Sequence, residues 1–166
     1  MDVSGLGGVD LRRAFGCVPS GVVAICAGVG SERIGMVVST FVPVSLDPPL
    51  AAVCVQNTSM TWSRLAQRPR LGVSVLADVH AHAARSLSTK DGDRFAGIST
   101  ETRDSGALFV AGCSVWMDVS VHQQIPAGDH DIVVLRIREL HLNDESDLTL
   151  EPIVFHRSSF RVLAKA

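Results

Sequence analysis

Residues 34–56 read IGMVVSTFVPVSLDPPLAAVCVQ, and this stretch indicates the fold. Apolar and β-branched residues fill 34–41 and 50–55, which is typical of strands. Asp47-Pro48-Pro49 breaks the chain between the two runs. Because the run 50–55 is apolar at nearly every position, it predicts a strand that is buried on both faces.

The rest of the chain continues this pattern of strands with few helices. Thr58 is a candidate N-cap for a helix that ends before Pro69, and Asp78 for a helix carrying His80 and His82. Further strands are expected at 22–27, 71–76, 114–124, 130–142, 152–155 and 159–163, and a polar loop at 86–105. About seven strands, two or three short helices and no regular βαβ alternation favour a mainly β fold, a closed antiparallel barrel.

Composition places the chain among globular domains. Its 166 residues fit a single domain, 1–166, with residues 1–9 as a flexible N-terminal segment. Hydrophobic residues make up 46% and charged residues 19%, which excludes a disordered chain, and a net charge of −2 gives no basic surface for nucleic acid. Residues 1–13 lack the regions of a signal peptide, and no stretch is apolar enough for a membrane span. We therefore expect a cytoplasmic protein with no nucleic-acid or membrane partner.

Motifs of the common catalytic and nucleotide-binding sites are missing from the sequence. It contains no GxGxxG, GxxxxGK[ST], HExxH or GxSxG. The four cysteines are Cys17, Cys26, Cys54 and Cys113. They lack CxxC spacing and three lie in apolar runs, so we expect reduced, buried thiols and no metal site. Among the histidines, His130 stands out because it follows Gly128-Asp129 at the mouth of a hairpin, where a side chain can face a ligand.

Polar clusters interrupt the apolar pattern at two places. Ser39 and Thr40 put adjacent hydroxyls at a strand end, and residues 56–61 (QNTSMT) put hydroxyls and N–H groups at a helix start. A helix start carries partial positive charge and can hold a phosphate, although an ordinary capping segment is the alternative. The loop at 90–94 (KDGDR) either supplies cations to the same anion or forms a solvated turn.

The order of these segments resembles the flavin reductase family with the FMN-binding split-barrel fold, the reductase components of two-component flavin-dependent monooxygenases. Seven pieces match in order and span about residues 10–163. The pieces are 19–22 (PSGV), 35–41 (GMVVSTF), 44–50 (VSLDPPL), Ser59 with Thr61, 90–97 (KDGDRFAG), 127–130 (AGDH) and 155–157 (FHR). The resemblance implies a Greek-key split β-barrel.

The resemblance also implies a set of cofactor-binding residues. They are Met36, Val37, Val38, Ser39, Thr40, Cys54, Val55, Gln56, Ser59, Thr61, Lys90, Arg94, Phe95, His156 and Arg157. In the family pattern, residues 36–41 would lie along the isoalloxazine ring, with Ser39 and Thr40 offering donors to its carbonyl side, and 54–56 would flank it. Ser59 and Thr61 would bind the phosphate, and the loop from Lys90 would close over the flavin tail. His130 would face the nicotinamide nucleotide and is the candidate catalytic residue.

The reaction that the resemblance implies is hydride transfer from NADH, or NADPH, to FMN or FAD, with the reduced flavin passing to a partner monooxygenase. Two alternatives stay open: an oxidase with tightly bound FMN, and a non-catalytic flavin- or haem-binding module. Trp62, Leu87-Ser88 and Gln56-Asn57 depart from the family pattern and leave the choice between FMN and FAD open. The apolar runs 37–44 and 50–55 exceed what one barrel can cover, so we expect a homodimer with flavin near its interface.

Overall fold

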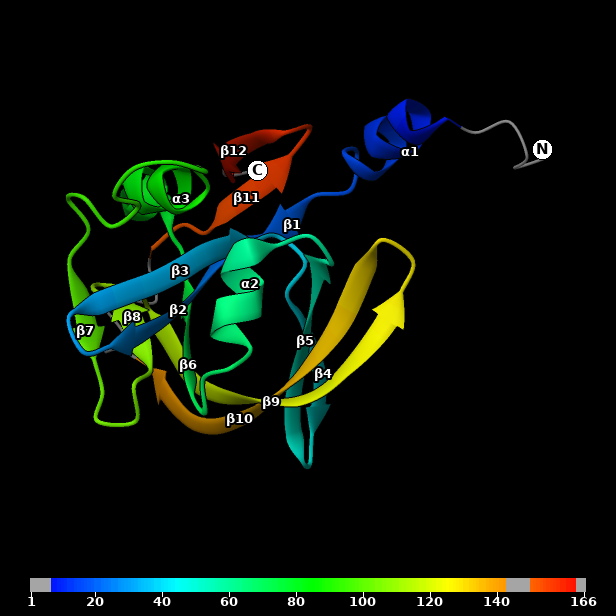
Figure 1. The fold of residues 1–166 in the computed structure, drawn as a ribbon. Helices are drawn as coiled ribbons and strands as arrows, with labels where there is room; N and C mark the ends of the chain where they lie inside the picture. The colour runs from blue at the N-terminus through cyan, green and yellow to red at the C-terminus, as the bar shows by residue number, and fades with distance from the viewer. Residues whose placement is uncertain (1–6, 143–149, 164–166) are drawn as a thin grey trace.

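A seven-stranded antiparallel sheet dominates the computed structural model, which describes residues 7–142 and 150–163. Its strands follow the order β3-β2-β6-β9-β10-β5-β4 (Figure 1). In that order they are β3 (Glu32–Val38), β2 (Val23–Val29), β6 (Leu71–Val75), β9 (Val115–Ala127), β10 (His130–Leu142), β5 (Pro49–Gln56) and β4 (Val42–Leu46). The sheet curls until β3 comes near β5, and α2 (Met60–Leu65) packs beside β3.

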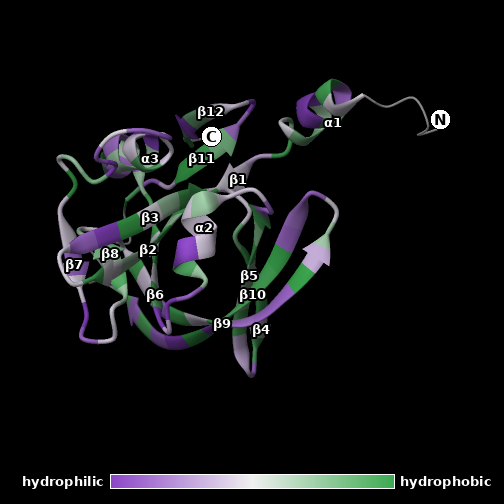
Figure 2. Ribbon diagram, in the orientation of Figure 1, coloured by the Kyte–Doolittle hydropathy of each residue, from purple (hydrophilic) through white to green (hydrophobic). Residues whose placement is uncertain are grey.

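Smaller elements lie outside this sheet. They are α1 (Gly8–Phe15), β1 (Ser20–Gly21), η2 (Asp78–His80), α3 (Ala81–Leu87), β7 (Thr100–Thr102), β8 (Leu108–Val110), β11 (Ile153–His156) and β12 (Ser159–Val162). The strands β1, β11 and β12 form a small sheet of their own, and β7 pairs with β8. The helix α1 stands apart from the main sheet, carries both hydrophobic and hydrophilic residues, and buries none of them (Figure 2).

The strand β2 separates two hydrophobic cores. Val23, Ile25 and Ala27 face a core that α2 closes, while Ala24 and Cys26 face a core under α3 and β8. This division follows from the strand geometry, which points successive side chains to opposite faces. Thus β2 is buried on both faces, and so is β5, as predicted, through its buried residues 51–53 and Val55, although Cys54 is only half-buried.

The mainly β prediction is confirmed, and β10 begins and ends at the predicted residues. The first predicted helix begins one residue later, because Ser59 rather than Thr58 is its N-cap: Ser59 Oγ accepts a hydrogen bond from the Trp62 N–H at 3.1 Å. The strand predicted at 34–41 ends at Val38, and residues 42–46 form an unpredicted strand, β4, that pairs with β5.

Two further boundaries differ from the sequence prediction. Asp78 starts a short 3-10 turn ahead of α3 rather than capping it, and the segment 86–105, expected to be a loop, contains the end of α3 and the short strand β7. Residues 1–6 of the expected flexible segment lie outside the described residues, and α1 begins at Gly8. None of these differences moves the strands that border the sites below.

Candidate functional site

A groove runs along β3 and β5, where the two strands approach each other. Its volume is about 320 Å³, which lies at the lower end of the range for ligand pockets. The lining residues are Met36, Val37, Val38, Ser39, Thr40, Cys54, Val55, Gln56, Ser59 and His130. All of them belong to the set predicted from the sequence, so the fold brings four separate predicted segments to one place.

Thr40 fastens the end of β3 to β5. Its hydroxyl accepts a hydrogen bond from the Cys54 N–H and donates one to the Cys54 carbonyl, both at 2.9 Å. The two bonds hold the groove wall in the stretch where β3 has already left its ladder with β2 at Val38. The Thr40 hydroxyl is thus engaged within the wall, whereas Ser39 lines the groove beside it.

His130 enters the groove from the first position of β10, opposite Gln56 of β5. Its Nδ1 lies 2.8 Å from Oδ1 of Asp129. This hydrogen bond is the main reason that the pKa of the Asp129 carboxyl is lowered. With Nδ1 bonded to the carboxylate, Nε2 is the ring nitrogen that remains to face a ligand.

Asn57 holds the turn in front of His130 from the other side. Its Nδ2 donates to the carbonyl of Gly128, and its backbone N–H donates to the carbonyl of Asp129, each at 3.1 Å. This role was not predicted from the sequence, where Asn57 stood out only as a departure from the family pattern. The available signal was its residue type, since asparagine side chains commonly bond to backbone groups in turns.

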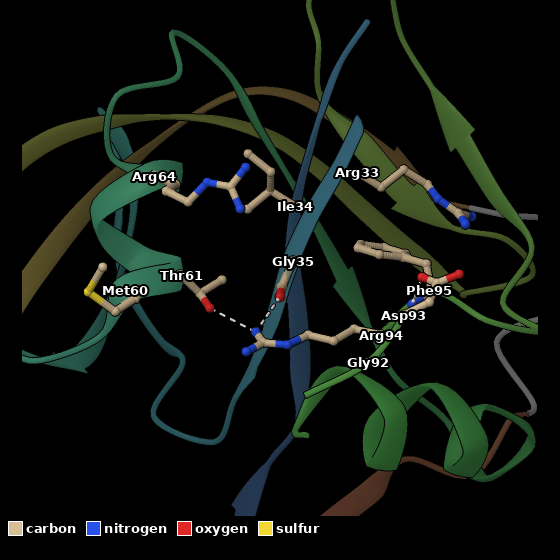
Figure 3. A pocket seen from close by; sticks show the side chains of 10 residues that line it. All are labelled: Arg33, Ile34, Gly35, Met60, Thr61, Arg64, Gly92, Asp93, Arg94 and Phe95. Atoms are coloured by element: carbon tan, nitrogen blue, oxygen red, sulfur yellow. Dashed lines mark hydrogen bonds between the residues drawn. The ribbon is translucent and has the colours of Figure 1, made fainter. Parts of the chain in front are cut away.

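A further cavity, here called the first arginine cavity, adjoins the groove and has a volume of about 300 Å³ (Figure 3). Its lining residues are Arg33, Ile34, Gly35, Met60, Thr61, Arg64, Gly92, Asp93, Arg94 and Phe95. The two spaces are lined by neighbouring residues of the chain, Gly35 and Met36 on β3 and Ser59 and Met60 at the start of α2.

Arg94 reaches across the first arginine cavity toward α2 (Figure 3). Its Nη1 donates to Thr61 Oγ1 at 2.7 Å and to the Gly35 carbonyl at 3.5 Å, and its Nη2 donates to the Lys90 carbonyl at 3.3 Å. The predicted residues Thr61 and Arg94 therefore meet. Lys90 contributes its carbonyl to this arrangement, and its side chain lines neither the groove nor the first arginine cavity. Because these hydrogen-bond partners are neutral, they do not neutralise the positive charge of the Arg94 guanidinium, which can therefore attract an anion.

Two more arginines line this cavity and were not predicted from the sequence. The guanidinium of Arg33 lies over the ring of Phe95, 4.9 Å from its centroid. Arg64 pairs with Glu32 at 2.5 Å. The buried Phe95 packs against β3 at Gly35, where an added Cβ would lie 2.7 Å from its ring. Arg33 comes from a strand and Arg64 from a helix, so no sequence motif joins them.

The predicted residues His156 and Arg157 lie elsewhere. They belong to the β11–β12 hairpin, where Arg157 lines a separate cavity with Arg12 and Arg13. His156 lines neither the groove nor the first arginine cavity. The structure therefore does not bring these two residues to the groove, in contrast to the other predicted positions on β3, β5 and α2.

Burial differs among the four cysteines. Cys26 and Cys113 are buried, as predicted, and burial raises the pKa of both thiols to about 12. Cys54 is half-buried in the groove and Cys17 is exposed, so the prediction of burial is wrong for these two. Across residues 7–142 and 150–163 no group of three or more metal-ligating side chains is found. Within the same ranges, no helix has the length and apolar character needed to cross a membrane.

Together the two spaces suit a ligand with a flat apolar part and an anionic end. Met36, Val37 and Val55 give the groove apolar walls, and the hydroxyl of Ser39 adds a polar contact. The adjoining cavity offers guanidinium groups, which bind phosphate strongly through charge-assisted hydrogen bonds. Hence a planar ring with a phosphate tail matches the chemistry of the site.

Comparison with known proteins points the same way. The family described as flavin reductase like domain matches residues 15–164. A flavin reductase of Pseudomonas putida is 32% identical over 150 residues, which cover 90% of this chain and 86% of that protein. An NADH:FMN oxidoreductase of Rhodococcus qingshengii is 28% identical and covers 91% of this chain and 79% of its own. The solved structure of the Streptomyces globisporus NADH:FAD oxidoreductase in complex with NAD and FAD fragments superposes with a TM-score of 0.84 at 32% identity, covering 94% and 92% of the two chains.

Proposed function

Since the chain belongs to the flavin reductase family and has its split-barrel fold, we propose that it transfers a hydride from NADH or NADPH to FMN or FAD. The observation that carries the proposal is the apolar groove with the first arginine cavity beside it. One space matches an isoalloxazine ring and the other matches its phosphate. When both nucleotides are bound, the flavin supplies the hydride-accepting N5 and the nicotinamide the hydride-donating C4.

The residues of the groove would orient the ring and exclude water. Met36–Val38 and Val55 provide the apolar wall, and Thr40 keeps that wall closed through its two bonds to Cys54. Ser39 would donate to the polar edge of the ring, where negative charge develops on reduction. His130 would contact the nicotinamide, with Asp129 and Asn57 as positioning residues.

The first arginine cavity would hold the flavin phosphate. Arg94 and Thr61 are already joined there at 2.7 Å, so a phosphate would meet a prearranged pair of donors. Arg33 and Arg64 would add charge from two sides. Relatives are named for FMN and for FAD, so both are candidate substrates of this chain, and NADH is the reductant in the names of both kinds.

The product would leave the groove for a separate flavin-dependent monooxygenase. Relatives include the reductase component of a trigonelline monooxygenase, and solved structures include the flavin reductase component of a two-component tryptophan halogenase. A cytoplasmic location fits this role, because NADH is consumed there and the free thiols Cys26 and Cys54 suit a reducing compartment.

The decisive experiment measures NADH oxidation under air, with and without added FMN, FAD or riboflavin. We expect oxidation to depend on added flavin and to saturate with it, because the reduced flavin dissociates after each turnover. Protein that purifies yellow with stoichiometric flavin and gains nothing from added flavin would instead be an oxidase or a carrier. An oxidation rate equal to that without protein would contradict the reductase function.

A homodimer belongs to the same proposal. The edge strand β4 leaves Val42 at 51%, Val44 at 54% and Leu46 at 96% exposure. An apolar edge strand of this kind invites pairing with another chain, and a twofold axis is the commonest arrangement. Because β4 pairs with β5, which lines the groove, a partner on this edge would lie next to the bound flavin.

Sedimentation at micromolar concentration tests the dimer. The wild-type chain should sediment at twice the mass of one chain, and Val44→Asp should shift it toward the monomer because a charge would be buried at the interface. Val162→Asp is the matched control, since Val162 is 56% exposed on β12, away from β4. A fully active wild-type monomer would exclude the dimer and the shared groove.

A further inference from the structure

A second arginine cavity lies between the end of α1 and the turn from β11 to β12. Its volume is about 480 Å³, and it is lined by Arg12, Arg13, Gly16, Cys17, Arg157 and Ser158. Its two walls are joined by a hydrogen bond from the Arg157 N–H to the Gly16 carbonyl at 2.8 Å. The cavity is thus formed by segments from the two ends of the described chain.

The backbone of the β11–β12 turn is unusual for its residues. Arg157 and Ser158 have φ values of 50° and 59°, in the left-handed region. A two-residue hairpin turn of this kind normally takes Asn and Gly, which adopt that region at low cost. A side chain as large as arginine therefore occupies a strained position here, and strain of this kind is concentrated at functional sites.

The three guanidinium groups around this cavity lack acidic partners. Within residues 7–142 and 150–163, no carboxylate forms an ion pair with Arg12, Arg13 or Arg157. Three like charges around one cavity repel each other, and a bound anion would relieve the repulsion. Phosphoryl groups suit such a site best, because arginine donors match their oxygens in pairs.

The second arginine cavity lies on the His130 side of the groove. In Figure 1, α1 stands on the side of the molecule where the β9–β10 hairpin ends. Asp129 lies in the turn of that hairpin, and its pKa is lowered mainly by the hydrogen bond from His130. The positive charge of Arg12 makes the smallest contribution to this lowered pKa, so Arg12 lies near enough to act on the turn. The first arginine cavity, in contrast, adjoins the groove at Met36 and Ser59.

Given the proposed function, we propose that the second arginine cavity binds the phosphoryl groups of the nicotinamide dinucleotide. The nicotinamide would then lie in the groove at His130, and the pyrophosphate or the 2′-phosphate would lie among Arg12, Arg13 and Arg157. The flavin phosphate stays in the first arginine cavity. Each of the two substrates thereby has an anion site of its own.

Steady-state kinetics of two charge-removing variants test the site. Arg12→Ala changes a helix that buries no residue, and Arg157→Asn keeps a residue type that tolerates the left-handed turn. Each variant should raise KM for NADH about tenfold, because it loses charge-assisted hydrogen bonds to a phosphoryl group, and the pair should raise it further. The control Arg161→Ala removes an arginine from the same hairpin that lines none of these cavities, and its KM should be unchanged.

The choice of hydride donor and of flavin identifies the group that is bound. With 1-benzyl-1,4-dihydronicotinamide, which has no phosphate, the variants should match the wild type. A larger loss with NADPH than with NADH assigns the 2′-phosphate, and an equal loss assigns the pyrophosphate. A loss that appears only when FAD replaces FMN would assign the cavity to FAD and overturn the proposal, as would an unchanged KM for both nucleotides.

Labelling of Cys17 gives a readout that is independent of activity. Cys17 is exposed in this cavity, whereas burial keeps the pKa of Cys26 and Cys113 at about 12 and those thiols protonated at pH 8. ADP should slow the reaction of Cys17 with iodoacetamide, measured by peptide mass spectrometry, in the wild type but not in the Arg12→Ala/Arg157→Asn protein. Protection without flavin reduction would refute the proposed function alone, and flavin reduction without protection would refute the nucleotide site alone.

Discussion

The two arginine cavities each contain three guanidinium groups but hold them in different ways. In the first, Arg94 is bonded to Thr61, Arg64 to Glu32, and Arg33 lies over Phe95. In the second, the side chains of Arg12, Arg13 and Arg157 have no acidic partner among the described residues.

This difference has a consequence for binding. Side chains that are already fixed lose little entropy when a ligand arrives, whereas loosely held ones lose more, about 0.5–1.5 kcal/mol each. The first cavity should therefore bind phosphate more tightly than the second. The flavin, which leaves as the reduced product after each turnover, would then be held more tightly than the nicotinamide nucleotide that reduces it.

The largest effect is expected from Arg94→Ala, which removes the central guanidinium of the first cavity. FMN binding should weaken about 100-fold, since the charge and its link to Thr61 are both lost. Riboflavin, which has no phosphate, should bind almost as in the wild type. Fluorescence titration with both ligands provides the measurement, and Arg138→Ala, which removes an exposed arginine bonded to Ser120, is the control. An equal loss for both ligands would show that Arg94 supports the fold rather than the phosphate.

The second prediction concerns the helix start beside Arg94. Replacing Ser59 and Thr61 together by alanine should weaken FMN binding by roughly 1–3 kcal/mol and riboflavin binding much less. Because Ser59 Oγ also caps α2, the double variant should lose about 1 kcal/mol of unfolding free energy as well.

Thermal unfolding separates the two losses for this pair. Ser63→Ala is the matched control, since the Ser63 hydroxyl bonds to the Met60 carbonyl in the same helix and lines neither arginine cavity. A double variant that is less stable but discriminates FMN from riboflavin as the wild type does would assign only the capping role to these hydroxyls.

The third prediction concerns the turn before His130, on the side of the second cavity. Asn57→Ala removes the side-chain bond to Gly128, so kcat should fall about fivefold through misplacement of His130, while the FMN affinity should change little. His130→Ala should lower kcat more strongly. In the background of His130→Ala, the Asn57 change should have no further effect, because a positioning residue acts only through its partner. Additive losses would contradict this coupling.

The groove was largely predictable from the sequence, because its residues lie on strands whose apolar pattern and order are visible. Residues 36–40 and 54–56 needed only a correct strand assignment and the family resemblance to be placed together. The strand β4 was missed because its proline, Pro43, and the break at Asp47-Pro48-Pro49 suggested a connection rather than a strand.

The arginine cavities were not predictable in the same way. Arg33 and Arg64 come from different elements, and their meeting depends on how α2 packs against β3. Likewise Arg12 and Arg157 are distant in sequence and meet only because Arg157 bonds to Gly16. Contacts between distant elements leave no local pattern, so only the folded structure reveals them.

The smallest effect should come from Glu32→Gln, which changes a single charge at the edge of the first cavity. Glu32 pairs with Arg64, and both side chains are about half exposed, at 55% and 49%. An exposed pair of this kind contributes at most about 1 kcal/mol to stability, so the fold should be unaffected. Removing the carboxylate raises the net positive charge of the cavity, and FMN should bind two- to fivefold more tightly at low salt.

Ionic strength distinguishes this electrostatic effect from a structural one. The gain in FMN affinity should largely disappear at 0.5 M NaCl, where exposed charges are screened within a few ångströms, and riboflavin should show no gain at either salt concentration. Weaker FMN binding in Glu32→Gln would mean that Glu32 serves mainly to orient Arg64. In that case the fixed geometry of the first cavity, more than its charge, would set it apart from the second.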